Sequence, residues 1–127
     1  MEQYLIDTNV VSDYFSASFS RAGMKFMDKV IDAVPNLSVI THIELLCWKT
    51  DVTTEQKVKD FITDSLVWDI STEVIAQCVK LRKGKKIKTP DAIIAATTLA
   101  YGYTLITNNE KDFASIKGLK IINPMKL

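Results

Sequence analysis

Four acidic side chains stand beside short apolar segments of the sequence, in a pattern that could support metal-ion chemistry. They are Asp7, Glu44, Asp91 and Asp112. Asp7 directly follows apolar residues 4–6, and Glu44 lies one helical turn beyond apolar residues 37–40. If these segments are parallel strands, such side chains lie at the carboxyl edge of the sheet, where ligands of open α/β sheets bind.

Carboxylates gathered at one place repel one another unless a cation lies among them. The chain has one histidine and two separated cysteines, so a ligand set would consist of oxygen atoms, which favours Mg²⁺ or Mn²⁺ over zinc. A carboxylate-bound Mg²⁺ keeps several waters, and one of them can be made nucleophilic toward a phosphodiester. The acidic residues therefore predict metal-dependent phosphodiester hydrolysis.

Each acid also has a simpler local interpretation, because acidic side chains are common near helix starts. These alternatives are helix capping by Asp7, a capping box of Thr41 with Glu44, compensation of a helix dipole by Asp91, and pairing of Asp112 with an Asn109 cap. Taken one at a time, several of these explanations suffice. The convergence of all four acids on one sheet edge favours a functional site.

The sequence contains residues typical of both ends of the helix that must position Asp91. Thr89 is a suitable N-cap, Pro90 suits the first helical position, and Gly102 suits a left-handed residue after the last turn. The helix is apolar almost all round and should be buried. A single tight turn joins it to a strand at residues 103–107, so helix and strand run antiparallel and Asp91 lies near the carboxyl end of that strand.

Short apolar strands alternate with helices along the whole chain. Strands are predicted at residues 4–6, 37–40, 66–70, 103–107 and 119–122. Helices are predicted at residues 10–15, 21–34, 90–101 and 110–116. Three more are predicted to begin at the Thr41 capping box, at a second capping box of Thr53 with Gln56, and at a Ser71 or Thr72 cap. The alternation predicts an α/β fold, a three-layer α/β/α sandwich with a mostly parallel four- to five-stranded sheet, as one domain over residues 1–127.

Composition restricts the class of protein. With 127 residues, 47% hydrophobic and 24% charged, the chain is long enough for one core and is not disordered. The net charge of +1 excludes a global basic field. Cys47 and Cys78 form no paired motif and are predicted to be buried thiols in a reducing compartment. A leader and a membrane-length apolar run are both missing, which predicts a cytoplasmic protein with no membrane contact.

Five basic side chains precede Asp91 closely: Arg82, Lys83, Lys85, Lys86 and Lys88. They could hold RNA phosphates beside a metal ion, although a solvated helix end is the alternative. His42 is more simply a structural or exposed histidine than a proton donor. Trp48 and Trp68 are most simply residues of the core or of an interface.

The chemistry-bearing segments together resemble the PIN-domain family across essentially the whole chain. They are L-I-D-T-N from Leu5, Glu44, T-P-D-A-I-I-A-A from Thr89 and L-I-T-N-N-E-K-D-F from Leu105. Single-domain chains of this size are similar to the VapC-type toxins of bacterial toxin–antitoxin pairs. The resemblance implies a Mg²⁺- or Mn²⁺-dependent endoribonuclease that cuts RNA, is inhibited by a cognate antitoxin and forms a homodimer.

The same resemblance assigns roles to individual residues. It implies that Asp7, Glu44 and Asp91 are catalytic metal ligands, with Asp112 as the fourth acid. The implied supporting residues are Thr8 and Asn9 beside Asp7, with Thr107 and Asn109 lining the site.

Two other functions are weighed, each by a position where the sequence departs from a known pattern. Asn109 stands where many family members have an acid, so a PIN-like module that binds RNA or a protein through a weakened metal site is the alternative. A phosphatase with Asp7 as nucleophile is disfavoured, because that chemistry in haloacid-dehalogenase-like proteins needs an acid two residues on, where Asn9 stands.

Overall fold

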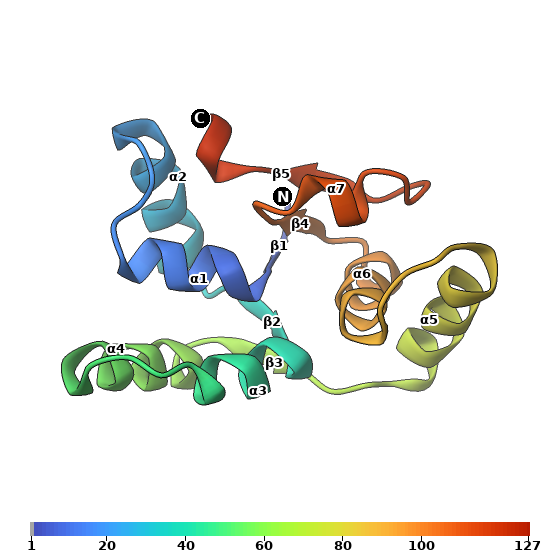
Figure 1. Ribbon diagram of the computed structural model, residues 1–127, viewed down its shortest axis with the longest axis horizontal. Helices are drawn as coiled ribbons and strands as arrows, with labels where there is room; N and C mark the ends of the chain where they lie inside the picture. Colours follow the sequence, from blue (N-terminus) through green and yellow to red (C-terminus); the bar gives the residue numbers. More distant parts are fainter. Residues whose placement is uncertain (1) are drawn as a thin grey trace.

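A computed structural model, which describes residues 2–127, contains one five-stranded sheet in which all paired strands are parallel. The strands lie in the order β3-β2-β1-β4-β5 (Figure 1). Their bounds are β1 Tyr4–Ile6, β2 Asn36–Ser38, β3 Leu66–Trp68, β4 Thr104–Ile106 and β5 Lys120–Ile122. The predicted parallel sheet is confirmed; β1 has its predicted bounds, and the other four strands are shorter than predicted.

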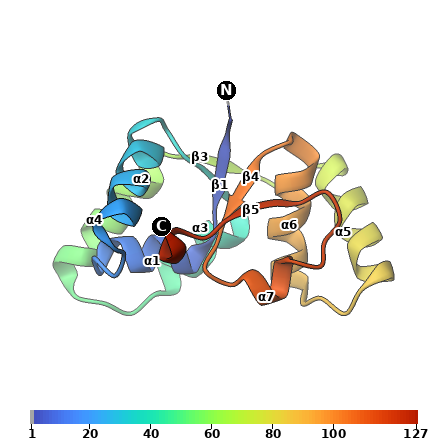
Figure 2. The same cartoon turned by 90° about the horizontal axis from the view of Figure 1, so that it is seen from above.

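Helices cover both faces of this sheet. They are α1 Thr8–Phe15, α2 Arg21–Asp32, α3 Val39–Cys47, α4 Val52–Thr63, α5 Thr72–Gly84, α6 Thr89–Tyr101, α7 Glu110–Phe113 and the 3₁₀ helix η1 Pro124–Lys126. Figure 2 shows α1, α2 and α4 on one side of the central strands, and α5, α6 and α7 on the other. The predicted α/β/α sandwich is therefore confirmed.

The strands supply both halves of the core because successive side chains of a strand point to opposite faces. Ile6 and Ile106 join the apolar cluster beneath α1, α2, α3 and α4. Leu5 and Leu105, one residue earlier in each strand, join the cluster beneath α6 and α7. This alternation fixes the register of the two central strands, because a shift by one residue would exchange the two clusters.

The strand order also determines where a site can form. From β1 the chain builds β2 and β3 outward on one side, then returns to place β4 and β5 on the other side. The order therefore reverses between β1 and β4, and the connections at their carboxyl ends diverge. Open α/β sheets bind ligands in the crevice at this point.

The start of α3 differs from the prediction. Ser38 is its N-cap, with the side-chain oxygen accepting from the Ile40 amide at 3.1 Å, so the predicted capping box of Thr41 with Glu44 is wrong. Strand β2 ends two residues earlier than expected, and the hydroxyl of its last residue, Ser38, caps the helix. Thr41 is therefore inside α3, fully buried.

Other helix ends show the same kind of difference. Lys88 is the N-cap residue of α6 and makes no side-chain capping bond, so Thr89 is the first helical residue rather than the cap. Asp51, not Thr53, caps α4. The prediction for the other end of α6 is confirmed: Gly102 has a φ of 68°, the left-handed conformation that glycine adopts without steric cost.

Both cysteines are unpaired, as predicted, but the prediction that they are buried is wrong. Cys47 is exposed at the end of α3, and Cys78 is half-buried on α5. Among residues 2–127, no helix is both long and apolar enough to cross a membrane.

Candidate metal site at the carboxyl edge of the sheet

A cavity of about 530 Å³ lies at the carboxyl edge, beside the point where the strand order reverses. Three of the predicted acids, Asp7, Glu44 and Asp91, line it together. They come from the end of β1, from α3 and from the first turn of α6. The structure thus brings together three side chains that are separated by up to 84 positions in the chain (91 − 7 = 84).

Asp7 is the most buried of the three acids, with 6% of its surface exposed. The Thr8 amide donates to Oδ1 and the Thr107 hydroxyl donates to Oδ2, each at 2.8 Å. Asp7 is also the N-cap of α1, so the capping interpretation is correct without excluding a second role. Both oxygens are held in place from different elements, α1 and the end of β4.

Burial, opposed by the hydrogen bonds from Thr107 and Thr8 and helped by the nearby charges of Asp91 and Glu44, raises the pKa of Asp7 to about 6. Burial also raises the pKa of Asp91, followed by the charges of Asp112 and Glu44. The charge of Lys88 lowers the pKa of Asp91 and is the smallest of these effects, so the acids are only partly compensated. A cation among them would remove the repulsion.

Glu44 is exposed on α3 and is oriented by a neighbouring hydroxyl. The Thr8 hydroxyl donates to Oε1 of Glu44 at 2.6 Å and lies 3.1 Å from the hydroxyl oxygen of Thr41. Since the Thr8 amide also donates to Asp7, this one residue links two of the acids. The placement of Thr8 between Asp7 and Glu44 extends its predicted role beside Asp7 alone.

The predicted fourth acid, Asp112, lies close enough to Asp91 for its charge to raise the pKa of that carboxyl. Asp112 is exposed and lines a neighbouring cavity of about 240 Å³, which shares Asp91 with the first. Asn109 lines the main cavity instead, and its Nδ2 donates to Oδ2 of Asp112 at 2.5 Å. Asn109 is the N-cap residue of α7, and this bond links it to the third residue of that helix.

Of the other predicted supporting residues, Asn9 lines the cavity, whereas Thr107 is fully buried and reaches the site through Asp7. The Asn9 Oδ1 atom is buried without a hydrogen-bond partner within the described part of the chain. The Thr107 hydroxyl, besides donating to Asp7, accepts from the Asn109 amide at 3.0 Å. Thr107 therefore ties the loop after β4 to the buried acid.

The residues present fit a hard divalent cation. The lining of the main cavity includes carboxylate, hydroxyl and amide oxygens and no lysine, arginine or histidine. Within residues 2–127, no three acidic, histidine or cysteine side chains are placed so that together they could hold a metal ion, so the fit lies in the type of ligand atom and not in a preformed ligand set. An ion such as Mg²⁺, which keeps several waters and takes few protein oxygens, suits this open acidic arrangement better than structural zinc.

Sequence reasoning missed several residues at the site. Ser12 lines the cavity, and its hydroxyl donates to the Asn9 carbonyl at 2.9 Å. The Asn108 amide group donates to the Asp13 carboxylate, joining the loop after β4 to α1. The spacing of Asn9, Ser12 and Asp13 along one helix could have indicated from the sequence that they lie near one another. The contact with Asn108 could not be predicted in this way, because it depends on tertiary structure.

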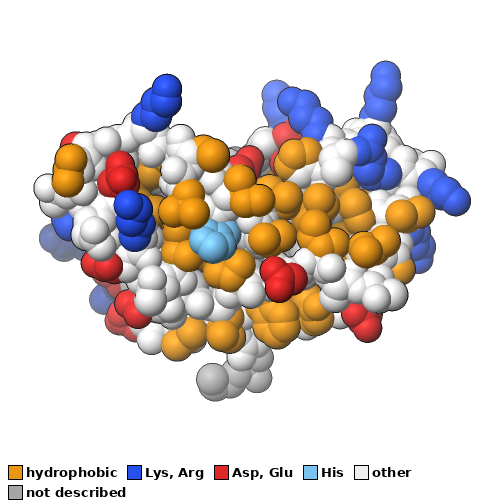
Figure 3. All heavy atoms as spheres, turned by 90° about the horizontal axis from the view of Figure 1, so that it is seen from below, with side chains coloured by type: hydrophobic (Ala, Val, Ile, Leu, Met, Phe, Trp, Pro, Cys, Tyr) orange, Lys and Arg blue, Asp and Glu red, His pale blue; other side chains and the backbone are white. Residues whose placement is uncertain are grey.

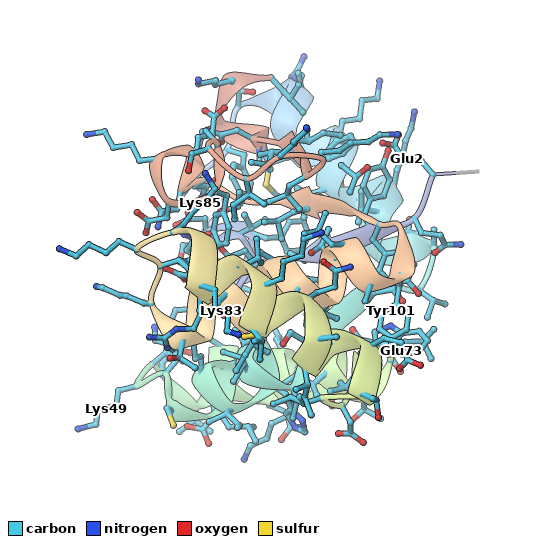
Figure 4. All side chains as sticks on the ribbon, turned by 90° about the vertical axis from the view of Figure 1, so that its right-hand side faces the viewer. Glu2, Lys49, Glu73, Lys83, Lys85 and Tyr101 are labelled. Atoms are coloured by element: carbon cyan, nitrogen blue, oxygen red, sulfur yellow. The ribbon has the colours of Figure 1, made fainter. Side chains whose placement is uncertain are left out.

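The predicted basic residues do not all lie beside the acids. Lys86 and Lys88 line the neighbouring cavity with Asp91, whereas Lys85 lines a separate cavity. Arg82 and Lys83 lie in the last turn of α5. Figure 4 shows Lys85 and Lys49 toward one side of the molecule, and Glu2 and Tyr101 toward the opposite side, where the chain begins.

A family profile described as "PIN domain" matches residues 4–119. The chain belongs to the PIN-domain family. The resemblance inferred from the sequence is thereby confirmed over nearly all of its length.

Individual PIN-domain relatives differ in how much of the chain they match. A "Toxin-antitoxin complex from Klebsiella pneumoniae" contains a chain that is 34% identical, with a TM-score of 0.74 and coverage of 96% of this chain and 98% of that one. "FitAcB from Neisseria gonorrhoeae" has a TM-score of 0.81 with 22% identity and coverage of 98% and 100%, a likeness of fold. "Ribonuclease VapC1" of Rickettsia felis is 50% identical over 36 residues, which span 28% of this chain and about a quarter (27%) of the relative.

Proposed function

We propose that the protein is a Mg²⁺- or Mn²⁺-dependent endoribonuclease that hydrolyses RNA phosphodiester bonds. The observation that carries this proposal is the meeting of Asp7, Glu44 and Asp91 around one cavity with no basic side chain in its lining. Membership of the PIN-domain family and the name of the Rickettsia felis relative, a ribonuclease, support the same conclusion.

In this proposal Asp7, Glu44 and Asp91 hold the cation, with Asn109 rather than Asp112 as the fourth polar group. A bound divalent ion supplies charge neutralisation and acidifies water beside the phosphodiester. The chain's own contribution is orientation: Thr107 and the Thr8 amide fix the two oxygens of Asp7, and the Thr8 hydroxyl fixes Glu44. Pre-positioned ligands lose little conformational freedom when the ion binds.

Basic residues beside the acids would hold the rest of the substrate. Lys86, Lys88 and Lys111 surround the neighbouring cavity, which meets the acidic cavity at Asp91. A strand of RNA lying across Asp91 would place one phosphate among the acids, where the cation binds, and another among these lysines. Such contacts give affinity that weakens as salt is raised.

The first test is cleavage of a broad RNA panel with and without metal. We expect cleavage with Mg²⁺ or Mn²⁺, none after addition of EDTA, and a loss of at least about 100-fold in Asp91→Asn, since even residues that only support metal ligands contribute 10- to 100-fold. Asp64 is the exposed C-cap residue of α4 and does not line the acidic cavity, so Asp64→Asn is the matched control and should keep full activity.

Two outcomes would contradict the proposal. Equal cleavage by the wild type and Asp91→Asn would identify a contaminating nuclease. If neither metal supports cleavage of any RNA, the protein is a PIN-like binding module with a weakened metal site, the alternative that Asn109 favours.

We further propose that the nuclease is the toxin of a type II toxin–antitoxin pair, acts in the cytoplasm and is inhibited by a cognate antitoxin. The structural neighbours are described as a toxin-antitoxin complex of Klebsiella pneumoniae and as VapBC of Salmonella typhimurium bound to DNA. Co-expression with the product of the adjacent small gene should restore growth to cells in which the toxin alone arrests it.

We also propose that two copies associate through the face formed by α3 and α5. Its exposed apolar side chains are Ile43 and Leu46 of α3 with Ile75 and Val79 of α5, each about half exposed. Figure 3 shows hydrophobic side chains gathered across this face, with few charges among them. An apolar surface of this kind on a small protein is costly to leave in water, and a two-fold axis would cover both copies at once.

Leu46→Glu should convert a dimer into a monomer, measured by light scattering after size-exclusion chromatography. A two-fold axis places the new charge in the interface twice, so its effect is doubled. Val52→Glu introduces the same charge at a position on α4 that is 84% exposed and should leave the mass unchanged. A wild-type protein with the mass of a monomer at micromolar concentration would refute the dimer.

A further inference from the structure

Trp48 forms part of the wall of the acidic cavity, although the sequence predicts only a core or interface role for it. It is the C-cap residue of α3, four positions after Glu44, and lines the cavity that contains Asp7 and Asp91. One part of the indole packs against the apolar cluster beneath α1 to α4, and the side chain remains partly exposed. The apolar cluster thus supports the Trp48 ring from behind, and the ring presents an aromatic surface at the proposed metal site.

The second tryptophan shows what a purely structural indole looks like in this protein. The Trp68 Nε1 group donates to Oδ1 of Asn36 at 2.9 Å, and the ring lies against Tyr101 with a centroid distance of 4.6 Å. By contrast, the Trp48 indole N–H has no partner among residues 2–127, and it is not one of the buried unpaired polar atoms. The polar end of Trp48 is therefore free to meet a ligand.

The cavity itself has two chemically different walls. Trp48, Leu45 and the exposed Cys47 supply its apolar wall, while Asp7, Glu44 and Asp91 supply its acidic wall. Its volume of about 530 Å³ is within the range of about 300–1,000 Å³ typical of small-molecule sites, so it can hold more than a metal ion. A nucleotide unit combines a charged phosphate with a flat apolar base and matches both walls.

We propose that Trp48 is a substrate-binding residue on which a nucleobase next to the cleaved phosphate stacks. The proposal rests on the proposed ribonuclease function and deepens it by naming a base subsite. The lysine-lined cavity with Lys86, Lys88 and Lys111 lies beyond Asp91, so the two subsites receive different parts of one RNA strand. Stacking on an aromatic ring favours single-stranded RNA and tolerates all four bases, because every base has a π-face.

The test uses tryptophan fluorescence, because the chain has only two tryptophans. In a Trp68→Phe background Trp48 is the sole indole, and we expect single-stranded hexaadenylate and hexauridylate to quench its emission. From the cost of losing one stacked base, Trp48→Ala should raise the dissociation constant about 5- to 100-fold, measured by fluorescence anisotropy of labelled oligonucleotides. Trp48→Phe should recover most of the affinity.

Two further variants separate stacking from structure. Trp48→Leu retains an apolar side chain behind the cavity and should bind as weakly as Trp48→Ala, while its thermal unfolding stays closer to that of the wild type. Trp68→Leu removes the other indole and should leave the dissociation constant unchanged. In a series of RNAs that each lack one base at a different position, the wild type should bind one member of the series more weakly than the intact RNA. Trp48→Ala should bind that member and the intact RNA equally well.

The failure of this proposal is distinguishable from failure of the ribonuclease function. If the wild type cleaves RNA but Trp48→Ala and Trp48→Leu keep its dissociation constant and its KM, the base subsite is refuted and the nuclease stands. Absence of quenching by either oligonucleotide refutes the subsite as well, and leaves Trp48 as a contact for a protein partner.

Discussion

Asp7→Asn is expected to lower RNA cleavage by at least about 1,000-fold and, at the same time, to make the metal-free protein more stable. The loss of activity follows from removal of the best-held carboxylate of the proposed metal site, whose contribution should exceed the 10- to 100-fold of a supporting residue. The gain in stability follows from the surroundings of Asp7. Its charge is 6% exposed and lies beside Asp91 and Glu44, and burial raises its pKa to about 6.

The sign of the stability change follows from proton linkage. Below about pH 4, Asp7 is protonated in both folded and unfolded chains and contributes nothing. Between about pH 4 and pH 6 the folded chain binds more protons than the unfolded chain, so the free energy of unfolding falls as pH rises. Above pH 6 the full cost of the buried charge is present, up to about 3 kcal/mol for a shift of about 2 pKa units.

The measurement is urea unfolding in EDTA at several pH values between 4 and 8. The free energy of unfolding of Asp7→Asn should exceed that of the wild type by an amount that grows from pH 4 to pH 6 and then stays level. Addition of Mg²⁺ should stabilise the wild type and change the variant little, because an ion that binds only the folded state raises its stability. Loss of stability at pH 7.5 without metal would contradict the prediction.

Asp51→Asn is the matched control for this substitution. Asp51 is also the N-cap of a helix, but it is exposed, and the pKa of its carboxyl is lowered, chiefly by the hydrogen bond from the Thr54 amide. Its charge therefore favours the folded state above the pKa and loses that effect in acid. Asp51→Asn should lower stability slightly at neutral pH, the opposite sign to Asp7→Asn.

The parallel sheet, and the convergence of Asp7, Glu44 and Asp91 on one cavity, could be predicted from the sequence better than the first residues of the helices. Apolar runs and the glycine after α6 act locally, so strand positions and the αL residue Gly102 follow from them directly. The start of α3 is a choice between Ser38 and Thr41, two residues that can each cap a helix. Packing decides it, because the Thr41 side chain is buried beside Thr8.

The site could be predicted where the backbone alone determines it. Asp7 and Asp91 are placed by a strand end and by a helix that returns to a strand, so topology brings them together. The choice between Asn109 and Asp112 depends on how α7 is rotated, which the four-residue helix does not encode through its own periodicity. Phe113 determines that rotation, because it is the one residue of α7 that is buried.

Phe113→Ala should lower the free energy of unfolding by about 3–5 kcal/mol, the cost typical of truncating a buried phenylalanine. Its side chain is 0% exposed and belongs to the cluster with Leu5, Ile94 and Leu105. Val52→Ala, at a position that is 84% exposed, should change the free energy by less than about 0.5 kcal/mol and serves as the control. A loss below about 1 kcal/mol for Phe113→Ala would contradict the packing.

The same substitution should damage the site beyond its effect on global stability. A helix of four residues has no stability of its own, so α7 is held by the packing of Phe113. Released from the core, α7 no longer fixes Asn109, whose amide donates to the Thr107 hydroxyl that in turn donates to Asp7. Amide hydrogen exchange should therefore accelerate across residues 107–116 under conditions where the sheet remains protected, and cleavage should fall by more than the unfolded fraction. Because Phe113→Leu leaves a smaller cavity, it should reproduce both effects in weaker form; if activity instead followed only the folded fraction in both variants, α7 would have no positioning role.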